Sequence, residues 1–493
     1  MMWIGYVLYG IYVASTLWLL FGALVQLHLL WHARHPGKIN PPTSPVELPF
    51  VTIQVPVYNE KFVIENLLHS LTQLNYPKHL FEIQVLDDST DETVGVIDRQ
   101  AAQIEQQGCL ITVVRRKGRI GYKAGALQNG LACCRGELVA IFDADFIPPA
   151  DFLRNMVPHF ADANVGMVQA RWGHLNAEQN FLTRIQTYLL DMHFLVEQEG
   201  RQQGGYLINF CGTAGIWRKQ CIVEAGGWDG EVLSEDLDLS YRAQLRGWRL
   251  KYDKNVVVPA QLPSTIDAFK IQQFRWTKGM AQVAKKTAPG LKAVQMPLIK
   301  KVQSGFHLLG SFTFVCLFIN AALALPLLQL RHQYPEFIAL TNYTSVGAIN
   351  LLAMAYLYYS SAVQTGDTPS RFIKSYFLFV VVYLAMSVQN AVAVLQGVAG
   401  MRSPFVRTPK FTPGLQNKDN EVLKFTWVTF LEVMMLFYFF CGIGLSLFYG
   451  DYFLILFFVL MCSGLIIVLS PTIKQTVFVQ KPVFVRLKKA FTF

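Results

Sequence analysis

The sequence lacks the short motifs that mark several common classes of enzyme. Its eight cysteines form no C-x-x-C pair and no zinc-type spacing, and its ten histidines form no H-E-x-x-H. No G-x-G-x-x-G fingerprint follows the first predicted strand, and no Walker P-loop occurs anywhere in the sequence. These absences argue against hydride transfer and ATP hydrolysis, and they give no indication of a zinc site.

Charged residues are also scarce. They make up 15% of the chain, whereas 52% of the residues are hydrophobic, which is too apolar for an ordinary soluble enzyme. Residues 3–30 contain no charged side chain and are numerous enough to cross a bilayer. A signal peptide is the alternative, but the run is long, no basic residue precedes it and no small-residue cleavage pattern follows it. We expect a transmembrane helix there.

Long apolar runs return in the second half of the chain, at 306–329, 345–363, 372–399, 426–448 and 452–470. Basic residues cluster beside these runs, which explains the net charge of +10 without a nucleic-acid partner. The positive-inside rule places the clusters on the cytoplasmic side, where they also attract anionic membrane lipid. Their members are Arg34 and Lys38, then Lys285, Lys286, Lys292, Lys300 and Lys301, and finally Lys474, Lys481, Arg486, Lys488 and Lys489.

A segment of ordinary charge lies between the first apolar run and the later ones. In residues 51–282 short apolar runs alternate with helical patterns, which predicts an α/β fold with a parallel sheet covered on both faces. In such sheets ligands bind beyond the carboxyl ends of the strands. We expect strands at 51–57, 81–86, 110–114 and 137–142, and helices at 60–74, 92–107 and 122–132.

Polar residues follow each of these four strands and would meet at one rim of the sheet. They combine acidic, amide and basic groups, which random loops would rarely bring together. The segments are Tyr58-Asn59-Glu60, Asp87-Asp88-Ser89, Arg115-Arg116-Lys117 and Asp143-Ala144-Asp145.

The last of these segments predicts a metal site. Residues i and i+2 of a strand point to the same face, so the carboxylates of Asp143 and Asp145 would lie together where the strand ends. Two hard oxygen ligands suit a Mg²⁺ or Mn²⁺ ion that bridges a diphosphate. The alternative is a solvated loop. Lys123 could add a cation for the phosphates, or it could be a surface lysine at the start of a helix.

Two later motifs have the same mixture of groups. Ser234-Glu235-Asp236 opens a helical stretch, and an ordinary helix cap is its alternative interpretation. On a helix, Gln272, Arg275 and Trp276 share one face. Arginine can pair with a diphosphate and tryptophan can stack on a sugar ring, although a buried structural Arg–Trp stack remains possible there.

Taken together, these motifs closely resemble processive family 2 glycosyltransferases, the group of cellulose, mannan, chitin and hyaluronan synthases. The resemblance runs from residue 51 to about residue 410. The sequence around Gln272 is most similar to that of the plant-type, cellulose-synthase-like branch, which makes mannan and glucan backbones. The matching residues are Asp87 and Asp88, Asp143 and Asp145, Glu235 and Asp236, and Gln272, Gln273, Arg275 and Trp276.

Two further segments are similar to parts of this family. Asn209-Phe210-Cys211-Gly212-Thr213 looks like the acceptor-side segment, which implies that Cys211, Gly212 and Thr213 contact the acceptor. Phe405-Val406-Arg407-Thr408-Pro409-Lys410 is similar to the F-x-V-T-x-K gating loop of bacterial cellulose synthase. Phe405, Thr408 and Lys410 match that loop, whereas Arg407 replaces a valine.

The resemblance implies a cytoplasmic GT-A domain, a Rossmann-like parallel sheet, inserted between transmembrane helices. The gating-type loop can be cytoplasmic only if residues 372–399 lie at the membrane surface or dip in and return; a sixth span with an external loop is the alternative. The expected segments are a transmembrane helix at 1–33, the GT-A domain at 46–290, an interfacial helix at 291–304, two transmembrane helices at 305–365, an interfacial or re-entrant helix at 370–402, the gating-type loop at 403–420, two transmembrane helices at 424–471 and a basic tail at 472–493.

The resemblance also implies a reaction, the inverting transfer of a hexose from a nucleoside-diphosphate sugar to a growing β-linked polysaccharide that is then translocated. Asp236 would be the general base, with its pKa raised by burial and by Glu235. Trp276 would stack the acceptor sugar, and Asp143 and Asp145 would hold the metal. The donor would be bound by Tyr58, Glu60, Asp87, Asp88, Lys123, Asp143, Gln272, Arg275 and Trp276.

Two other functions remain possible. A transporter would need ionisable residues inside its spans, and only Glu432 clearly qualifies. A non-processive enzyme could instead glycosylate a lipid such as ceramide or diacylglycerol. We expect UDP-glucose as the donor, followed by GDP-mannose. The lack of a long plant-style extension favours a bacterial plasma membrane over a Golgi membrane, and the oligomeric state is open.

Overall fold

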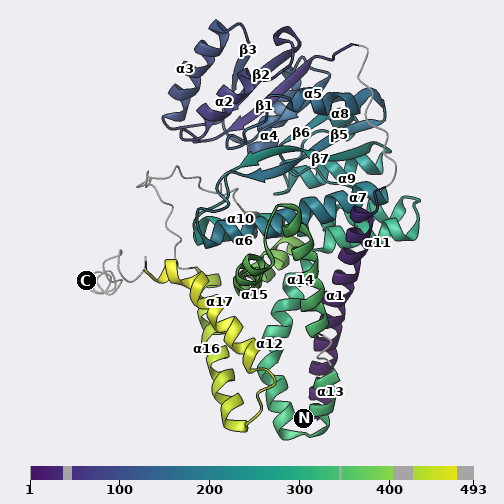
Figure 1. The fold of residues 1–493 in the computed structure, drawn as a ribbon, viewed down its shortest axis with the longest axis vertical. Coiled ribbons are helices and arrows are strands. Elements are labelled where there is room, and N and C mark those ends of the chain that lie inside the picture. Colours follow the sequence, from purple (N-terminus) through teal and green to yellow (C-terminus); the bar gives the residue numbers. More distant parts are fainter. Residues whose placement is uncertain (1, 37–46, 344–346, 404–425, 475–493) are drawn as a thin grey trace, which may run out of the picture.

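The computed structural model describes residues 2–36, 47–343, 347–403 and 426–474. An α/β domain sits at one end of a long helical part (Figure 1). The gating-type loop, with Phe405, Thr408 and Lys410, and the end of the basic tail lie outside the described residues.

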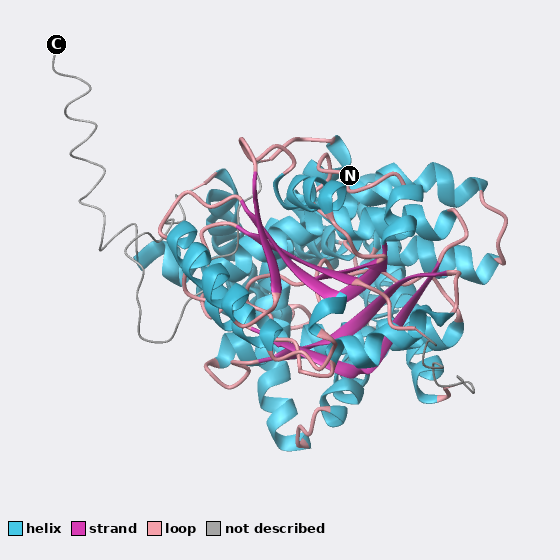
Figure 2. Ribbon diagram, turned by 90° about the horizontal axis from the view of Figure 1, so that it is seen from above, coloured by secondary structure: helices cyan, strands magenta, loops and turns pink. Residues whose placement is uncertain are grey.

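The α/β domain contains one seven-stranded sheet in the order β3-β2-β1-β4-β6-β5-β7. β1 to β4 are parallel, as the alternating pattern predicts, whereas β6 runs antiparallel to both of its neighbours, β4 and β5. Figure 2 shows this twisted sheet with helices on both sides. The strands are β1 Val51–Val57, β2 Phe81–Asp87, β3 Leu110–Arg115, β4 Leu138–Ile141, β5 Val165–His174, β6 Gly215–Arg218 and β7 Arg249–Ala260.

The central strands are buried because helices cover both of their faces. Polar side chains within them pair across the sheet: Gln54 Nε2 donates to Gln84 Oε1 at 2.7 Å, and Thr52 Oγ1 donates to Glu82 Oε1 at 2.7 Å. The three predicted helices are present as α2, α3 and α4. The helices of this domain are α2 Ile64–Thr72, α3 Thr93–Gln106, α4 Tyr122–Cys133, α5 Phe152–Met156, α8 Lys219–Glu224 and α9 Glu235–Leu245, with short 3-10 turns at Lys78–Leu80 and Val157–Ala161.

A layer of helices separates the sheet from the long helical part. Figure 1 shows α6 and α10 lying across the end of the bundle beside the α/β domain. A π-helical turn, His193–Gln198, interrupts the path from α6 to α7. The helices of the layer are α6 Phe181–Met192, α7 Glu199–Gly204, α10 Ile266–Ala293 and α11 Leu298–Leu309.

Among the described residues, the helices that run lengthwise through the helical part include α1 Met2–Arg34, α12 Phe312–Gln333, α14 Gly347–Gln364, α16 Trp427–Tyr449 and α17 Ile455–Lys474 (Figure 1). Contacts between their ends fix their directions. At the end far from the sheet, Tyr6 lies against Phe337 in the short helix α13 (Glu336–Tyr343), and Arg331 Nε pairs with Asp451 at 2.6 Å. At the near end, Arg34 donates to Ser360 at 2.9 Å.

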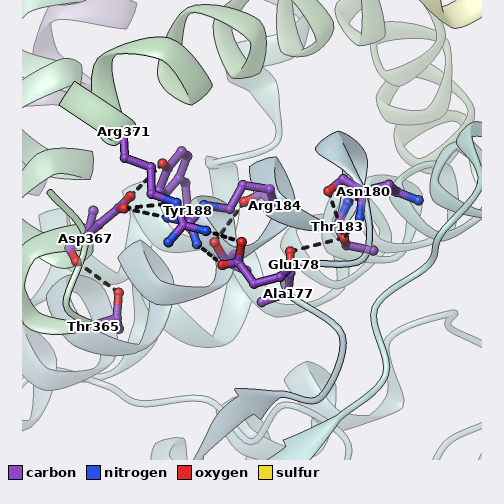
Figure 3. Close-up of polar contacts among 11 residues, drawn as sticks. Ala177, Glu178, Asn180, Thr183, Arg184, Tyr188, Thr365, Asp367 and Arg371 are labelled. Carbon is purple, nitrogen blue, oxygen red and sulfur yellow. Dashed lines mark hydrogen bonds and ion pairs between the residues drawn. The ribbon is translucent and has the colours of Figure 1, made fainter. Parts of the chain in front are cut away.

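Helix α15 (Pro369–Ala399) begins and ends on the side of the α/β domain. Just before its first turn, Asp367 accepts hydrogen bonds from Arg184 and Tyr188 of α6, and Figure 3 shows Arg184 also reaching Glu178. Toward its other end, Gln396 accepts a hydrogen bond from Lys278 of α10 at 3.1 Å. Both ends of α15 therefore lie on the side of the α/β domain.

Length and composition alone select a slightly different set of membrane helices. Among the described residues, α1, α12, α15, α16 and α17 are long and apolar enough to cross a membrane. α14, which the sequence analysis treats as a span, is not in this set because asparagine, tyrosine and serine lower its hydropathy. α15 is in the set, yet most residues of its apolar stretch are buried within the protein, where they pack against α10, α12 and α17.

A buried ion pair joins the layer to the bundle. Lys270 Nζ of α10 lies 2.8 and 2.7 Å from the two carboxylate oxygens of Glu432 in α16, and the Glu432 side chain is fully buried. The backbone oxygen of Lys270 also accepts a hydrogen bond from Gln389 of α15 at 3.0 Å. Glu432 thus has a structural partner within the protein.

Breaking this pair should destabilise the protein. Glu432→Gln leaves the Lys270 ammonium buried without its counter-charge, which costs about 3–5 kcal/mol, so we expect a lower Tm in detergent. The double variant K270M/E432L should recover most of the loss, because replacing both partners with apolar side chains removes the buried charges. Glu231→Gln, which breaks the exposed pair with Arg402, is the control and should leave Tm unchanged. Equal Tm values for the wild type and Glu432→Gln would contradict the structural role of the pair.

Candidate active site

The rim at the carboxyl ends of β1, β2 and β4 forms one wall of a cavity of about 180 Å³. The cavity brings together residues that are up to 220 positions apart in the sequence, from Pro56 to Trp276. Most of the predicted site residues line it, namely Tyr58, Glu60, Asp88, Lys123, Asp143, Asp145, Cys211, Gly212, Glu235, Asp236, Gln272, Arg275 and Trp276. Two predicted residues, Asp87 and Thr213, lie behind its wall.

The two neighbouring aspartates after β2 have different positions. Asp87 is buried, pairs with Arg115 Nε at 2.8 Å and accepts a hydrogen bond from the Ser89 amide at 2.9 Å. Asp88 lines the cavity and is bound by both Arg116 Nε and Nη2, at 2.8 and 2.7 Å. Asp88 is therefore placed to meet a ligand, whereas Asp87 supports the turn that carries it.

Lys123 joins the predicted metal site to the acceptor-side segment. Its Nζ donates to Asp143 Oδ1 at 2.5 Å and to the backbone oxygen of Gly212 at 2.8 Å. Gly212 has a φ of +83°, and a Cβ there would lie 3.0 Å from Asp236 Oδ2, so glycine allows this close approach. Burial alone would lower the pKa of Lys123, but the nearby carboxylates of Asp143 and Glu235 raise it overall.

The donor set at the end of β4 fits a divalent cation. Asp143 and Asp145 both line the cavity, and the Asp143 amide donates to Thr213 Oγ1 at 2.8 Å, which fixes the turn. Within the described parts of the chain, no group of three or more His, Cys, Asp or Glu side chains is placed to hold a metal ion. Mg²⁺ and Mn²⁺ sites that act on phosphates commonly use one or two carboxylates, with substrate oxygens completing the shell. The two aspartates match that pattern.

Asp236 lies at the start of α9, beside Glu235. Burial and the neighbouring Glu235 carboxylate raise the pKa of Asp236 to about 7. Ser234 makes no side-chain cap hydrogen bond, so ordinary helix capping does not account for this motif. A carboxyl group whose pKa lies near neutrality is well suited to accept a proton.

The predicted face of α10 is turned toward the cavity. Gln272, Arg275 and Trp276 all line it, and the Trp276 ring lies 6.4 Å from the Trp172 ring between centroids. Burial lowers the pKa of the Arg275 guanidinium, although Glu235 and Asp236 oppose that shift. The helical spacing therefore predicts the direction of all three side chains correctly.

Several side chains that line the cavity were not predicted from the sequence, among them Arg119, Trp172 and His174. The Arg119 guanidinium lies 3.2 Å from the centroid of the Tyr58 ring. Trp172 and His174 come from β5, and His174 Nε2 is 3.1 Å from Asp191 Oδ1. Arg119 follows β3 on the predicted rim and could have been found there. The two β5 residues could not, because the sequence analysis identified no fifth strand.

A second cavity of about 410 Å³ adjoins the first. It continues between α1, α12, α14 and α15, with aromatic side chains such as Phe306, Tyr358 and Tyr383 in its wall. The residues that line both cavities are Trp172, Leu190, Cys211, Ser234, Asp236 and Trp276. Asp236 thus lies where the first cavity meets a passage into the helix bundle.

Comparison with known proteins agrees with the motif analysis. Residues 49–279 match the family described as "Glycosyltransferase like family 2". The chain is 39% identical over 59% of its length to glucomannan 4-beta-mannosyltransferase 1 of Cyamopsis tetragonoloba, and the match covers 59% of that protein. It is 34% identical over 77% of its length to glucomannan 4-beta-mannosyltransferase 1 of Oryza sativa subsp. japonica, covering 73% of that protein. The chain thus spans about half to three quarters of the length of these relatives.

A solved structure supports the fold. The mannosyltransferase PcManGT from Pyrobaculum calidifontis, in complex with GDP-Man and Mn²⁺, matches 80% of this chain and all of its own with a TM-score of 0.53 at 20% identity. The GT-A-like sheet predicted by the resemblance is confirmed. From its motifs, its fold and its match to most of the rice protein, the chain belongs to glycosyltransferase family 2.

Proposed function

We propose that this protein is an inverting, metal-dependent membrane hexosyltransferase that extends a β-linked polysaccharide and translocates it. The observation that carries the proposal is the junction of the two cavities at Asp236 and Trp276. A nucleotide sugar in the first cavity and a chain in the second would meet at that point. No nucleic acid takes part.

The proposed donor is GDP-mannose, with UDP-glucose second. The sequence analysis ranks these donors in the opposite order, because its motifs mostly concern the diphosphate. Two facts about similar proteins support the reversal: the relatives are described as glucomannan 4-beta-mannosyltransferases, and the structural neighbour is bound to GDP-Man and Mn²⁺.

On the donor side, Asp143 and Asp145 would hold the cation, Mg²⁺ or Mn²⁺, which supplies positive charge to the departing diphosphate when it is bound. Arg275 and Lys123 would share that task, since both cations line the same cavity. Lys123 would then release Asp143, with which it pairs in this structure. Asp88, Glu60, Tyr58 and Asp87 would hold the nucleoside, Asp87 through the turn it supports.

On the acceptor side, Asp236 would accept the proton of the attacking sugar hydroxyl. The new bond to the anomeric carbon forms while the bond to the diphosphate breaks on the opposite face, so one displacement inverts the configuration. Trp276 would stack on the acceptor sugar, and Cys211 and Gly212 would border it. Thr213 is fully buried and instead fixes the turn that carries Asp143, so the expected contact between Thr213 and the acceptor is not supported. Because Gly212 lies against both Asp236 and Lys123, the donor and acceptor sides are coupled there.

The proposed membrane arrangement has five spans: α1, α12, α14, α16 and α17. α15 would lie at the interface, because both of its ends contact the layer below the sheet. This arrangement leaves the amino terminus outside and places the catalytic domain and the basic tail in the cytosol. The pairing of Glu432 with Lys270 removes the feature that favours a transporter. The sequence features favour a bacterial plasma membrane, whereas the similar proteins come from plants and favour the alternative, a Golgi membrane. The remaining segment boundaries stay predictions.

Asp236→Asn should nearly abolish transfer while nucleotide binding remains. General-base catalysis typically contributes about 10²–10⁴-fold to the rate, and the amide cannot accept the proton. The measurement is sugar transfer by purified protein, beside a titration of bound nucleotide diphosphate with Mn²⁺. A variant that keeps more than about a tenth of the wild-type rate would exclude Asp236 as the base.

The rate should also depend on pH near neutrality. Asp236 acts as the carboxylate, so kcat should rise as the pH passes above its pKa of about 7 and fall below it. Glu235→Gln removes the neighbouring negative charge, lowers the pKa of Asp236 and should move this limb to lower pH. If the residual activity of Glu235→Gln had the same dependence on pH as the wild type, the assignment of Asp236 as the base would be contradicted.

The donor and the product can be identified in washed membranes that contain the protein. We would supply Mg²⁺ or Mn²⁺ with radiolabelled GDP-mannose or UDP-glucose, with Asp236→Asn as the control. We expect label from GDP-mannose in ethanol-insoluble material that endo-β-mannanase digests. If label from UDP-glucose entered material that endo-β-glucanase digests, UDP-glucose and not GDP-mannose would be the donor. Label in the organic phase alone would mean a lipid acceptor and would contradict a polysaccharide product.

A further inference from the structure

A cluster of charged and polar side chains lies in the second cavity, past the junction at Trp276. The cavity is otherwise mostly apolar, yet His193, Glu197, Arg201 and His307 all line it. His193 and Glu197 come from the π-helical turn His193–Gln198, and Arg201 comes from α7 just after it. Such π-helical turns are rare and are frequently found at functional sites. None of the motifs of the sequence analysis includes these residues.

The carboxylate of Glu197 is the centre of this cluster. Its Oε2 lies 2.8 Å from His193 Nδ1 and 3.7 Å from Arg201 Nη1, and Gln26 of α1 donates to its Oε1. Burial alone would raise its pKa, but Arg201 and His193 hold the pKa of Glu197 at about 2. Glu197 is thus a charged hydrogen-bond acceptor at the wall of an apolar cavity.

The guanidinium of Arg201 has hydrogen-bond donors that the described residues do not pair. Its side chain is only 3% exposed, and within the described residues its Nε and Nη1 have no hydrogen-bond partner. Leaving buried donors of a charged group unsatisfied is unfavourable, and native proteins usually avoid it. A ligand in the cavity would supply the acceptors that the protein does not.

The cluster is connected to the acceptor end of the catalytic site. His193 Nε2 lies 3.5 Å from Cys211 Sγ, and Cys211 lines both cavities. The ligand that reaches the cluster is therefore continuous with whatever occupies the position at Trp276.

The chemistry of the cluster selects the class of ligand. Glu197 and Arg201 carry opposite charges, so a neutral ligand is favoured and the carboxylate repels phosphates. A carboxylate and a guanidinium together accept from and donate to hydroxyl groups, whereas an acyl chain would leave both unsatisfied. Aromatic rings of the same cavity, including Phe306 and Tyr376, offer faces for sugar rings. A polyhydroxylated chain meets all of these requirements.

We propose that His193, Glu197 and Arg201 form a second sugar-binding subsite, which holds hydroxyl groups of the acceptor chain beyond the sugar stacked on Trp276. The inference rests on the proposed function and adds to it a place that recognises the chain already made. Binding there would keep the product attached between successive transfers.

The test compares acceptors of two lengths, β-mannobiose and β-mannopentaose, with GDP-mannose and Mn²⁺. The longer acceptor reaches the subsite, so the wild type should show a KM for mannopentaose at least about tenfold lower than for mannobiose, as one hydrogen bond to a charged group implies. In Glu197→Gln the two KM values should become nearly equal. His193→Gln serves as a second variant, should Glu197→Gln fold poorly, and should reduce the same ratio.

Glu199→Gln is the matched control. Glu199 is a buried glutamate two positions away that pairs with Lys254 at 3.0 Å and lines neither cavity. This variant should keep the wild-type ratio of KM values. A length dependence that survives in both Glu197→Gln and His193→Gln would overturn the subsite while leaving the proposed function intact. A wild type that extends neither acceptor and labels lipid instead would overturn the proposed function, and the subsite with it.

Discussion

The ion pair between Lys270 and Glu432 lies where the membrane part and the catalytic part of the molecule meet. It fixes α10 to α16 in a region from which water is excluded, and a lone charge there would be strongly unfavourable. Within the next two turns of α10, Gln272, Arg275 and Trp276 face the cavity. Lys278 then donates to Gln396 of α15. A single helix therefore positions one wall of the cavity and connects it to two helices of the bundle.

The charges of the site are arranged around this helix. Asp143, Asp145, Glu235 and Asp236 contribute four carboxylates to one cavity, and Lys123 and Arg275 lie among them. The resulting field raises the pKa of Lys123, and burial beside Glu235 raises that of Asp236. In the proposed mechanism the cations and the base would therefore have opposite roles in one small volume: the cations would stabilise the leaving diphosphate, and Asp236 would accept the proton of the incoming hydroxyl.

Much of this site follows from local rules of sequence. The end of a strand places Asp143 and Asp145, which lie in the turn after β4 and not on the strand itself, and the period of a helix places Gln272, Arg275 and Trp276. Each pattern needs only neighbouring residues. Trp172 and His174 were missed because their positions depend on how distant segments pack, whereas Arg119 follows β3 and could have been found by the same rule as the other rim residues. The antiparallel strand β6 could not be foreseen from its four residues, Gly215–Arg218, which owe their place to β4 and β5 on either side.

The helical part shows the same limit. Composition selects α15 and passes over α14, whereas the end contacts of the two helices place α14 lengthwise and return α15 to its starting side. The deciding contacts, Arg34 with Ser360 and Arg184 with Asp367, join residues more than 180 positions apart, which no local pattern reveals. Similarly, no local sequence pattern predicts the π-helical turn that begins at His193.

The most direct test of the account is an electron cryomicroscopy map of the protein in lipid nanodiscs, frozen after incubation with GDP-mannose and Mn²⁺. The account predicts continuous density for a chain of sugars that starts at Trp276, passes Glu197 and runs between α1, α12 and α14. Density for a lipid in that passage, with its head group at Asp236, would contradict a polysaccharide synthase and identify a lipid glycosyltransferase.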